Sequence, residues 1–187
     1  MSPPFFYTGL FSPSENSLVL SEENSKHIVQ VVRKQQGEQI ILTDGLGTIY
    51  HAEIIEAHKK KCVVKITDTK KVNAPLDKVC IAVSPVKNNS RFEWFLEKAT
   101  EIGVTEIVPL HCKRTEKQHF RYDRMQGILI SAMLQSQQAW LPVLQQPVKY
   151  EDYIKASENR GSKFIAHCEP ENRSSLKEII SQQSVEQ

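Results

Sequence analysis

The chain has 187 residues, 40% of them hydrophobic and 25% charged, and its formal net charge is +2. This composition is typical of a soluble globular protein, and the length suffices for one large or two small domains. We expect a cytoplasmic protein, because no apolar run has transmembrane length and residues 1–11, with two prolines and no basic residue, do not resemble a signal peptide.

Strand patterns dominate residues 5 to about 68. The apolar run 39–43 and the segment 48–57 flank Asp44-Gly45-Leu46-Gly47, a sequence typical of a tight turn. A further strand is predicted over residues 62–67. This order of strands predicts an antiparallel meander or a small β-barrel.

One helix is predicted within this β-rich part. Ser21 is its expected N-cap, and the helix is expected to end near Gly37. Its apolar stripe is formed by Ile28, Val31 and Val32. A polar connector follows at residues 70–75, and we expect two domains that meet there, residues 1–72 and 73–187.

Strand and helix patterns alternate after the connector, which predicts an α/β domain with a mostly parallel sheet and helices on its faces. The predicted strands are residues 79–83, 104–110 and 163–167, the first of them buried on both faces. The predicted helices are residues 90–102, 125–136, 151–156 and 174–182. The first begins with a capping box at Ser90, carries Phe92, Phe95, Leu96, Ala99 and Ile102 on one face, and is closed by Gly103. No strand pattern follows the last helix, so the sheet is expected to be incomplete within these residues.

The four cysteines, at positions 62, 80, 112 and 168, form no CxxC pair, and we expect reduced, mostly buried thiols. His111-Cys112 and His167-Cys168 suggest zinc, but neighbours on a strand point to opposite faces, so no metal is expected.

Basic residues gather in residues 58–71 and again in 111–124. Either run could face phosphate groups, although a solvated surface is the commoner explanation for each run alone. Glu93, Glu97 and Glu101 recur on one helix face, where Lys98 and the amphipathic pattern favour a solvated face over an acid/base site. Gln135 follows two apolar residues and is expected at the edge of the core, with either structural partners or a ligand.

Several segments, taken together and in order, resemble the RsmE-type ribosomal RNA uridine methyltransferases from about residue 5 to residue 170. They are residues 26–33 (KHIVQVVR), Asp44-Gly45 with 50–54 (YHAEI), Lys87 with 93–104, 107–110 (IVPL) with Arg114, and 132–136 (AMLQS) with Leu141-Pro142. Two positions depart from the family pattern, since Leu134 stands for its glutamate and its arginine falls near Gln138. The family's GPEGG and LGxRILRxETA motifs do not occur in these residues.

This resemblance implies a PUA-like β-barrel followed by a SPOUT-type α/β domain, which in the family ends in a trefoil knot that holds S-adenosylmethionine. It implies methylation of a uridine at N3 in 16S ribosomal RNA of the small ribosomal subunit, by a homodimer that needs neither metal nor membrane. Without the two missing motifs, residues 1–187 alone are expected to be inactive.

The resemblance names no catalytic base in this sequence, and the catalytic residues stay unassigned. We expect RNA contacts from Arg33, Lys34, Lys87, Arg91, Lys113, Arg114 and Gln135. The rim of the donor pocket is expected at His167, Cys168 and Glu169, because ligands of open α/β sheets bind at the carboxyl ends of strands.

Two alternatives stay open beside the methyltransferase hypothesis. One is a non-enzymatic RNA-binding protein with a barrel and a degenerate α/β platform, and the other is a structural interaction module. Coding sequence after Gln187 that contains GPEGG would favour the enzyme, whereas a stop codon there would favour the RNA-binding protein.

Overall fold

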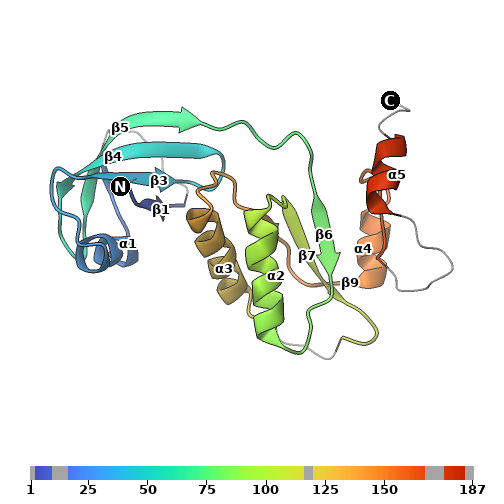
Figure 1. Ribbon diagram of the computed structural model, residues 1–187. Coiled ribbons are helices and arrows are strands. Elements are labelled where there is room, and N and C mark those ends of the chain that lie inside the picture. Colours follow the sequence, from blue (N-terminus) through green and yellow to red (C-terminus); the bar gives the residue numbers. More distant parts are fainter. Residues whose placement is uncertain (1–2, 10–16, 116–119, 167–174, 184–187) are drawn as a thin grey trace. The chain divides into compact units, whose positions relative to one another are not determined.

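The computed structural model describes residues 3–9, 17–115, 120–166 and 175–183 (Figure 1). The chain forms two compact units, residues 1–150 and 151–187, and each is described by itself. None of the described helices combines the length and the apolar composition that crossing a membrane requires.

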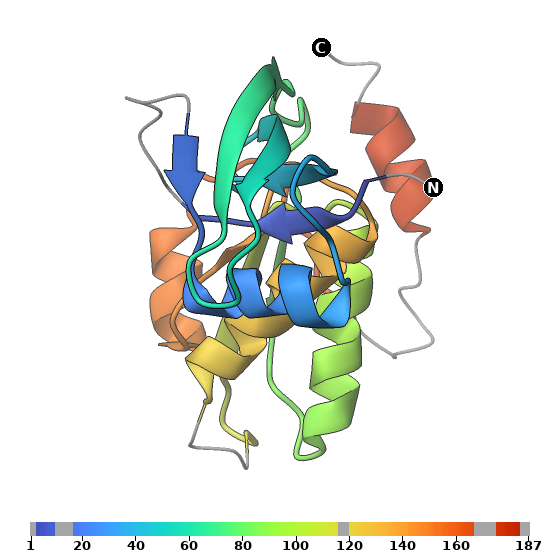
Figure 2. The same ribbon diagram turned by 90° about the vertical axis from the view of Figure 1, so that its left-hand side faces the viewer.

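The first unit begins with a curled five-stranded sheet in the order β1-β3-β4-β5-β2 (Figures 1 and 2). Its strands are β1 (Phe5–Tyr7), β2 (Ser17–Val19), β3 (Gln39–Thr43), β4 (Thr48–Glu56) and β5 (Val63–Lys71). β3, β4 and β5 pair antiparallel in sequence order, so the predicted meander is confirmed. β5 continues to Lys71, four residues beyond its predicted end.

Alternate residues of these strands build the core of the sheet, as the two-residue period of a strand requires. In β4, for example, Tyr50, Ala52 and Ile54 are buried. α1 (Glu22–Lys26) closes this core, since the buried hydroxyl of Ser25 accepts a hydrogen bond from the Cys62 amide at 2.9 Å. The predicted N-cap is confirmed, because Ser21 Oγ accepts a hydrogen bond from the Asn24 amide.

The predicted helix changes form and ends earlier than expected. η1 (His27–Val31) is a π-helix in which the Val32 amide donates to the His27 carbonyl oxygen. This wider turn moves Val31 off the face that Ile28 occupies, so Val31 is exposed and its expected place in the apolar stripe is wrong. The segment then turns at Arg33, which has a φ of 58°.

The second part of this unit is a parallel sheet in the order β6-β7-β8, and β9 also pairs parallel with β7. Its strands are β6 (Cys80–Val83), β7 (Glu106–His111), β8 (Val143–Leu144) and β9 (Val148–Lys149). The predicted parallel pairing is therefore confirmed. Burial of β6 on both faces is wrong, because Cys80 is exposed, and among the residues of β6 only Ile81 and Val83 pack into the core.

Two helices, α2 (Asn89–Glu101) and α3 (Tyr122–Gln135), lie side by side next to this sheet (Figure 1). They share a core that includes Phe92, Leu96, Ala99, Met125 and Leu129. α2 begins before the predicted capping box, because Asn88 Oδ1 accepts a hydrogen bond from the Ser90 amide. Gly103 closes it at a φ of 85°, as predicted, but Ile102 caps the end and is exposed rather than part of the apolar face.

The turn between β3 and β4 joins the two sheets of the first unit. The Gly47 amide donates to the Ala139 carbonyl oxygen, and the Leu141 amide donates to the Gly45 carbonyl oxygen, both at 2.9 Å. Trp140 lies between these residues, and its indole Nε1 donates to the carbonyl oxygens of Val72 and Asn73. The compact unit thus continues across residues 72 and 73, and the proposed division of the chain at that point stays a prediction.

The second unit contains most of α4 (Tyr150–Ala156) and all of α5 (Leu176–Gln183). The bounds of these helices differ by one or two residues from those of the helices predicted over 151–156 and 174–182. The strand predicted over 163–167 is wrong for residues 163–166, which form no strand, while His167 lies outside the described residues. Phe164 and Ile165 are exposed, so this apolar run lacks the burial and the pairing partner that a strand needs.

The described cysteines are in the thiol form, and they differ in burial. Cys62 is buried, and burial raises the pKa of its thiol because the charged thiolate is poorly solvated there. Cys80 is exposed and Cys112 is half-buried, so the expectation of mostly buried thiols holds for Cys62 alone among these three.

Candidate nucleic-acid interface

Four of the predicted RNA-binding residues follow the carboxyl ends of neighbouring parallel strands. β6 and β7 end side by side, since Val83 lies opposite Pro109, so the segments after both strands leave the same edge of the sheet. Lys87 and Arg91 follow β6, whereas Lys113 and Arg114 follow β7. This edge is where ligands of open α/β sheets bind. We call these four residues the carboxyl-edge cations.

Hydrogen bonds hold the two segments of this edge together. The hydroxyls of Ser84, after β6, and Thr115, after β7, share a hydrogen bond of 2.7 Å. Thr115 Oγ1 also accepts a hydrogen bond from the Cys112 amide at 2.8 Å, and the Thr115 amide donates to the Cys112 carbonyl oxygen. These bonds close a tight turn that presents Lys113 and Arg114 at its exposed tip.

Two features extend the positive charge at this edge. Arg91 lies in the first turn of α2, where the partial positive charge of a helix N-terminus also favours anions. β9 ends at Lys149, which lies opposite His111 at the end of β7 and is exposed. Lys149 was not among the residues predicted from the sequence, because the short strand that places it has only two residues.

The other two predicted cations, Arg33 and Lys34, lie between η1 and β3. Arg33 is exposed and has a left-handed backbone, a conformation that costs energy for a residue with a Cβ. Lys34 is half-buried and pairs with Glu38, with 2.6 Å between Nζ and Oε1. The hydrogen bond from Lys34 is the largest cause that lowers the pKa of Glu38, followed by the hydrogen bond from the Gln35 amide.

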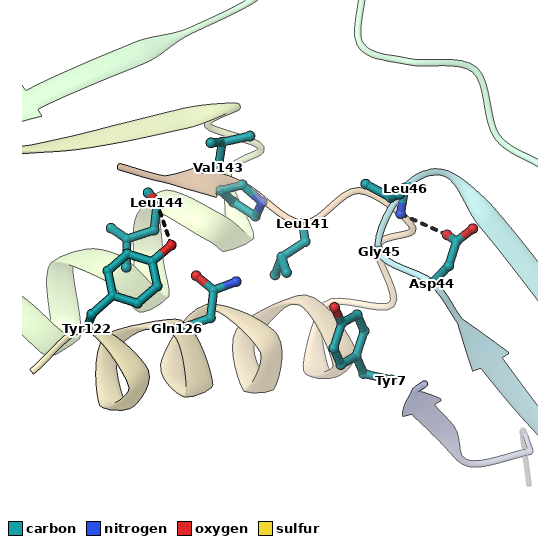
Figure 3. Close-up of a pocket in the computed structure, with 10 residues that line it drawn as sticks. Tyr7, Asp44, Gly45, Leu46, Tyr122, Gln126, Leu141, Val143 and Leu144 are labelled. Atoms are coloured by element: carbon teal, nitrogen blue, oxygen red, sulfur yellow. Dashed lines mark hydrogen bonds between the residues drawn. The ribbon is translucent and has the colours of Figure 1, made fainter. Parts of the chain in front are cut away.

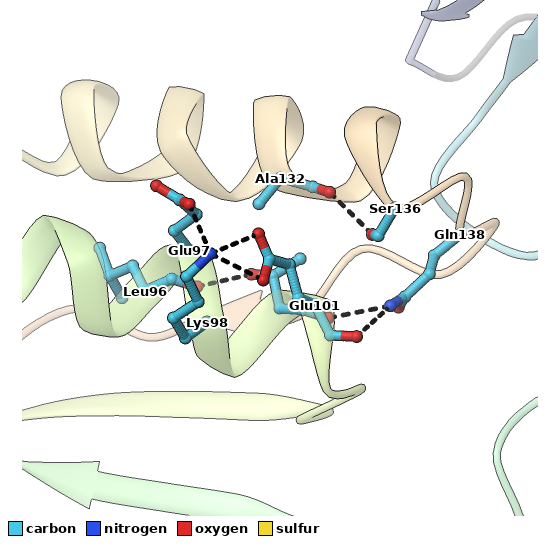
Figure 4. A network of polar contacts seen from close by, with 8 residues as sticks. Leu96, Glu97, Lys98, Glu101, Ala132, Ser136 and Gln138 are labelled. Carbon is cyan, nitrogen blue, oxygen red and sulfur yellow. Dashed lines mark hydrogen bonds and ion pairs between the residues drawn. The ribbon is translucent and has the colours of Figure 1, made fainter.

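Gln135 is the last residue of α3 and is exposed, so its expected place at the edge of the core is wrong. The helix ends there, and its final residue turns away from the packed face. Gln138, near which the resemblance places a family arginine, has a structural role (Figure 4). Its Nε2 donates to the carbonyl oxygens of Thr100 and Glu101, at 3.1 and 2.9 Å, and so caps the end of α2.

The glutamates of α2 form surface ion pairs, as the preference for a solvated face over an acid/base site predicted. Lys98 Nζ lies 2.9 Å from carboxylate oxygens of both Glu97 and Glu101 (Figure 4). Glu93 accepts two hydrogen bonds from the Arg124 guanidinium, and this pair joins α2 to α3. The hydrogen bond to Glu93 is also the main cause that raises the pKa of Arg124.

A cavity of about 240 Å³ lies where the β3–β4 turn meets α3 and the segment after it (Figure 3). Tyr7 and residues 44–46 line it from the first sheet. Tyr122, Gln126 and residues 141–144 line it from the second part of the unit. Tyr122 and Gln126 are four residues apart and share a helix face, but no pattern in the sequence connects them with Tyr7 or with residues 44–46, so the sequence did not predict this cavity.

The predicted rim of the donor pocket, His167, Cys168 and Glu169, lies outside the described residues. Within the described ranges, no group of three or more His, Cys, Asp and Glu side chains is placed to hold a metal ion. The site as described is therefore a basic edge of a parallel sheet, with a small cavity at the junction of the two sheets.

Comparison with known proteins shows which protein family this chain matches. A model described as an RNA methyltransferase domain matches residues 72–186, and one described as an RNA methyltransferase PUA domain matches residues 20–67. The ribosomal RNA small subunit methyltransferase E of Synechocystis sp. is 26% identical over 143 residues, which make up 75% of this chain and 46% of that protein. The chain thus spans about half the length of this curated relative.

Solved structures share the fold. A crystal structure described as an rRNA methyltransferase of Porphyromonas gingivalis is 36% identical, with a TM-score of 0.72, over 81% of this chain and 63% of that one. A methyltransferase of Legionella pneumophila, solved with the cofactor S-adenosylmethionine, is 27% identical with a TM-score of 0.82. The match covers 95% of this chain and 75% of the Legionella chain. The predicted fold class is confirmed, and the chain belongs to the RsmE-type RNA methyltransferases, with a PUA domain before the methyltransferase domain.

Proposed function

We propose that this chain acts in the methylation of a uridine at N3 in 16S ribosomal RNA, in the cytoplasm, with S-adenosylmethionine as the methyl donor. The two family matches support the reaction class. The named Synechocystis relative supports small-subunit ribosomal RNA as the substrate, and the donor bound to the Legionella structure supports the cofactor. The uridine N3 position and the assembly of a homodimer rest on the sequence resemblance.

The observation that carries the RNA-binding part of this proposal is the set of carboxyl-edge cations. Lys87, Arg91, Lys113 and Arg114 follow adjacent strand ends, and the Ser84–Thr115 hydrogen bond holds their two segments together. Phosphate contacts of this kind carry little sequence information, but they position an RNA strand relative to a reaction site. We therefore assign to these side chains the task of holding the RNA backbone.

The same residues do not fit the methyl donor. The reactive sulfonium of S-adenosylmethionine is a cation, and four cationic side chains would repel it, whereas they attract phosphate. The donor supplies an activated methyl group, so the protein mainly has to align this group with the ring nitrogen and aid loss of the N3 proton. His167, Cys168 and Glu169 stay our prediction for the rim of the donor pocket.

Uridine N3 lies on the Watson–Crick edge of the base, so the target must be unpaired or turned out of its helix before it reacts. The PUA-domain match and the exposed Arg33, in the segment between η1 and β3, support a second contact with the RNA, away from the carboxyl edge. Two separated backbone contacts would hold the strand on both sides of the target base.

The test is nucleoside analysis of 16S ribosomal RNA by liquid chromatography and mass spectrometry, from cells with and without the gene that encodes this chain. We expect 3-methyluridine to disappear on deletion and to return with the intact gene, and to return less with a gene carrying Lys113→Ala and Arg114→Ala. Unchanged 3-methyluridine in the deletion strain would contradict the proposed reaction and would favour a non-enzymatic RNA-binding protein.

A further inference from the structure

We propose that the cavity between the two sheets of the first unit binds one unpaired nucleobase of the RNA, at a place separate from the base that is methylated. This inference rests on the proposed function in so far as it needs an RNA ligand. Figure 3 shows the cavity between Tyr7, from β1, and Tyr122, from the start of α3, with Gln126 and Leu141 between them.

The cavity is large enough for one planar nucleobase and too small for a larger ligand. Its volume is about 240 Å³, below the roughly 300–1,000 Å³ of pockets that enclose drug-sized ligands. A whole nucleotide cofactor would not fit, whereas a planar base can enter from a strand that stays outside. Leu46 and Val143, both in the lining, are more than half exposed, so the cavity reaches the surface.

The walls suit a flat, largely apolar ligand. Leu141, Val143 and Leu144 provide apolar surface, and the two tyrosine rings provide aromatic surface. The Tyr122 hydroxyl donates to the Leu144 carbonyl oxygen at 2.8 Å, which fixes this ring in place before any ligand arrives. Aromatic side chains bind unpaired bases because every base has a face that stacks.

One polar atom at the cavity has no hydrogen-bond partner among the described residues. Gln126 Oε1 is buried and has no hydrogen-bond partner within the described part of the chain. A buried acceptor in this state costs free energy unless a donor reaches it. Nucleobases carry N–H groups on their edges, so a base would supply the donor that Gln126 needs with a small side-chain adjustment.

Charge at the cavity distinguishes a base from a phosphate. Asp44 lies in the lining, and its Oδ1 accepts hydrogen bonds from the Leu46 and Thr48 amides, at 2.8 and 3.0 Å, which hold the carboxylate in place. A phosphate group would be repelled by this carboxylate, whereas an uncharged base would not.

Lysines lie close to the cavity along the chain and could hold the phosphates outside it. Lys71, at the end of β5, pairs in register with Thr48, directly after the turn that lines the cavity, and Lys70 pairs with Ile49. Both lysines are exposed. They belong to the basic run of residues 58–71, which the carboxyl-edge site does not use. A strand could therefore place its backbone on these lysines and one base in the cavity.

The test uses the full chain, an oligouridine of seven nucleotides and the same oligonucleotide with a central 4-thiouridine. Irradiation followed by mass spectrometry should locate cross-links in peptides that contain Tyr7, Tyr122 or Gln126. Gln126→Leu, which keeps the size of the side chain, should weaken oligonucleotide binding about tenfold. Gln146→Leu makes the same chemical change at an exposed position outside the lining and should leave affinity unchanged.

The outcomes separate this inference from the proposed function. Salt-dependent binding with cross-links only elsewhere, or with equal affinities for the two variants, would overturn the nucleobase site and leave RNA binding intact. Absence of any salt-dependent binding would overturn both. Thermal unfolding of each variant, monitored by circular dichroism, controls for loss of the fold.

Discussion

Gly47 packs directly against the indole ring of Trp140. A Cβ at Gly47 would lie only 2.6 Å from Trp140 Cε2 and 2.9 Å from the Val72 carbonyl oxygen. The Trp140 indole is itself held by hydrogen bonds to the carbonyl oxygens of Val72 and Asn73. The turn of the first sheet, the connector and the segment after α3 therefore meet at one tightly packed point.

Replacing Gly47 with alanine should strongly destabilise the first unit. Gly47 has a φ of 93°, so a side chain adds backbone strain to the overlap with Trp140. We expect the free energy of unfolding, measured by urea denaturation, to fall by about 2–5 kcal/mol. Gly37→Ala is the matched control, because Gly37 has a φ of 85° and nothing within 4 Å of an added Cβ, and it should lose only about 1–2 kcal/mol. Equal losses would contradict the packing role of Trp140.

Replacing Gln138 with alanine should destabilise the C-terminal end of α2. The change removes both hydrogen bonds to the Thr100 and Glu101 carbonyl oxygens. We expect a loss of about 1–2 kcal/mol in the free energy of unfolding. Gln135→Ala, at an exposed position, should change stability by less than about 0.5 kcal/mol, and a loss as large as that of Gln138→Ala would show that the cap is not the cause.

Glu38 should titrate below its ordinary pKa of about 4.5, mainly because of the hydrogen bond from Lys34. A lowered pKa in the folded state means that the pair adds stability at neutral pH, and that this stability is lost as the pH falls below about 4.5. Carboxyl titration by NMR should show the low pKa, and Lys34→Gln should raise it. A Glu38 that titrates at or above its ordinary pKa would contradict the ion pair.

The same ion pair makes Lys34 less available for RNA binding than Arg33, although both were predicted to contact RNA. Lys34 already pairs with Glu38, whereas Arg33 is exposed in a strained backbone conformation. Arg33→Ala should therefore weaken the binding of a 16S ribosomal RNA fragment more than Lys34→Ala, as measured by filter binding at low salt. If Lys34→Ala had the larger effect, the local pairing would not govern which cation meets the RNA.

Much of this fold could be predicted from local patterns. The turn at residues 44–47, the helix N-cap at Ser21 and the closing glycine at position 103 all depend on short-range chemistry, and the structure has them in these roles. The errors arise where tertiary context decides. The apolar residues of β6 look fully buried in the sequence, but burial depends on whether other elements cover both faces of a strand, and Cys80 is exposed. The run 163–166 has a strand composition and no partner.

The candidate site was predictable in part for the same reason. Lys87, Arg91, Lys113 and Arg114 follow predicted strands, so parallel pairing alone brings them to one edge. The cavity depends on contacts between Tyr7 and Gly45, whose absent Cβ would lie 3.0 Å from the Tyr7 ring, and on Gln126 from another part of the chain. No local pattern connects residues so far apart in sequence.

The most direct test of the account is the salt dependence of RNA binding by the chain and by a Lys113→Gln, Arg114→Gln double variant. If both side chains contact phosphates of unpaired RNA, the slope of log affinity against log salt should become shallower by about 1.4. The matched double variant Lys59→Gln, Lys60→Gln removes equal charge from another exposed segment and should change the slope less. An unchanged slope for the first variant would contradict the carboxyl edge as the RNA-binding surface.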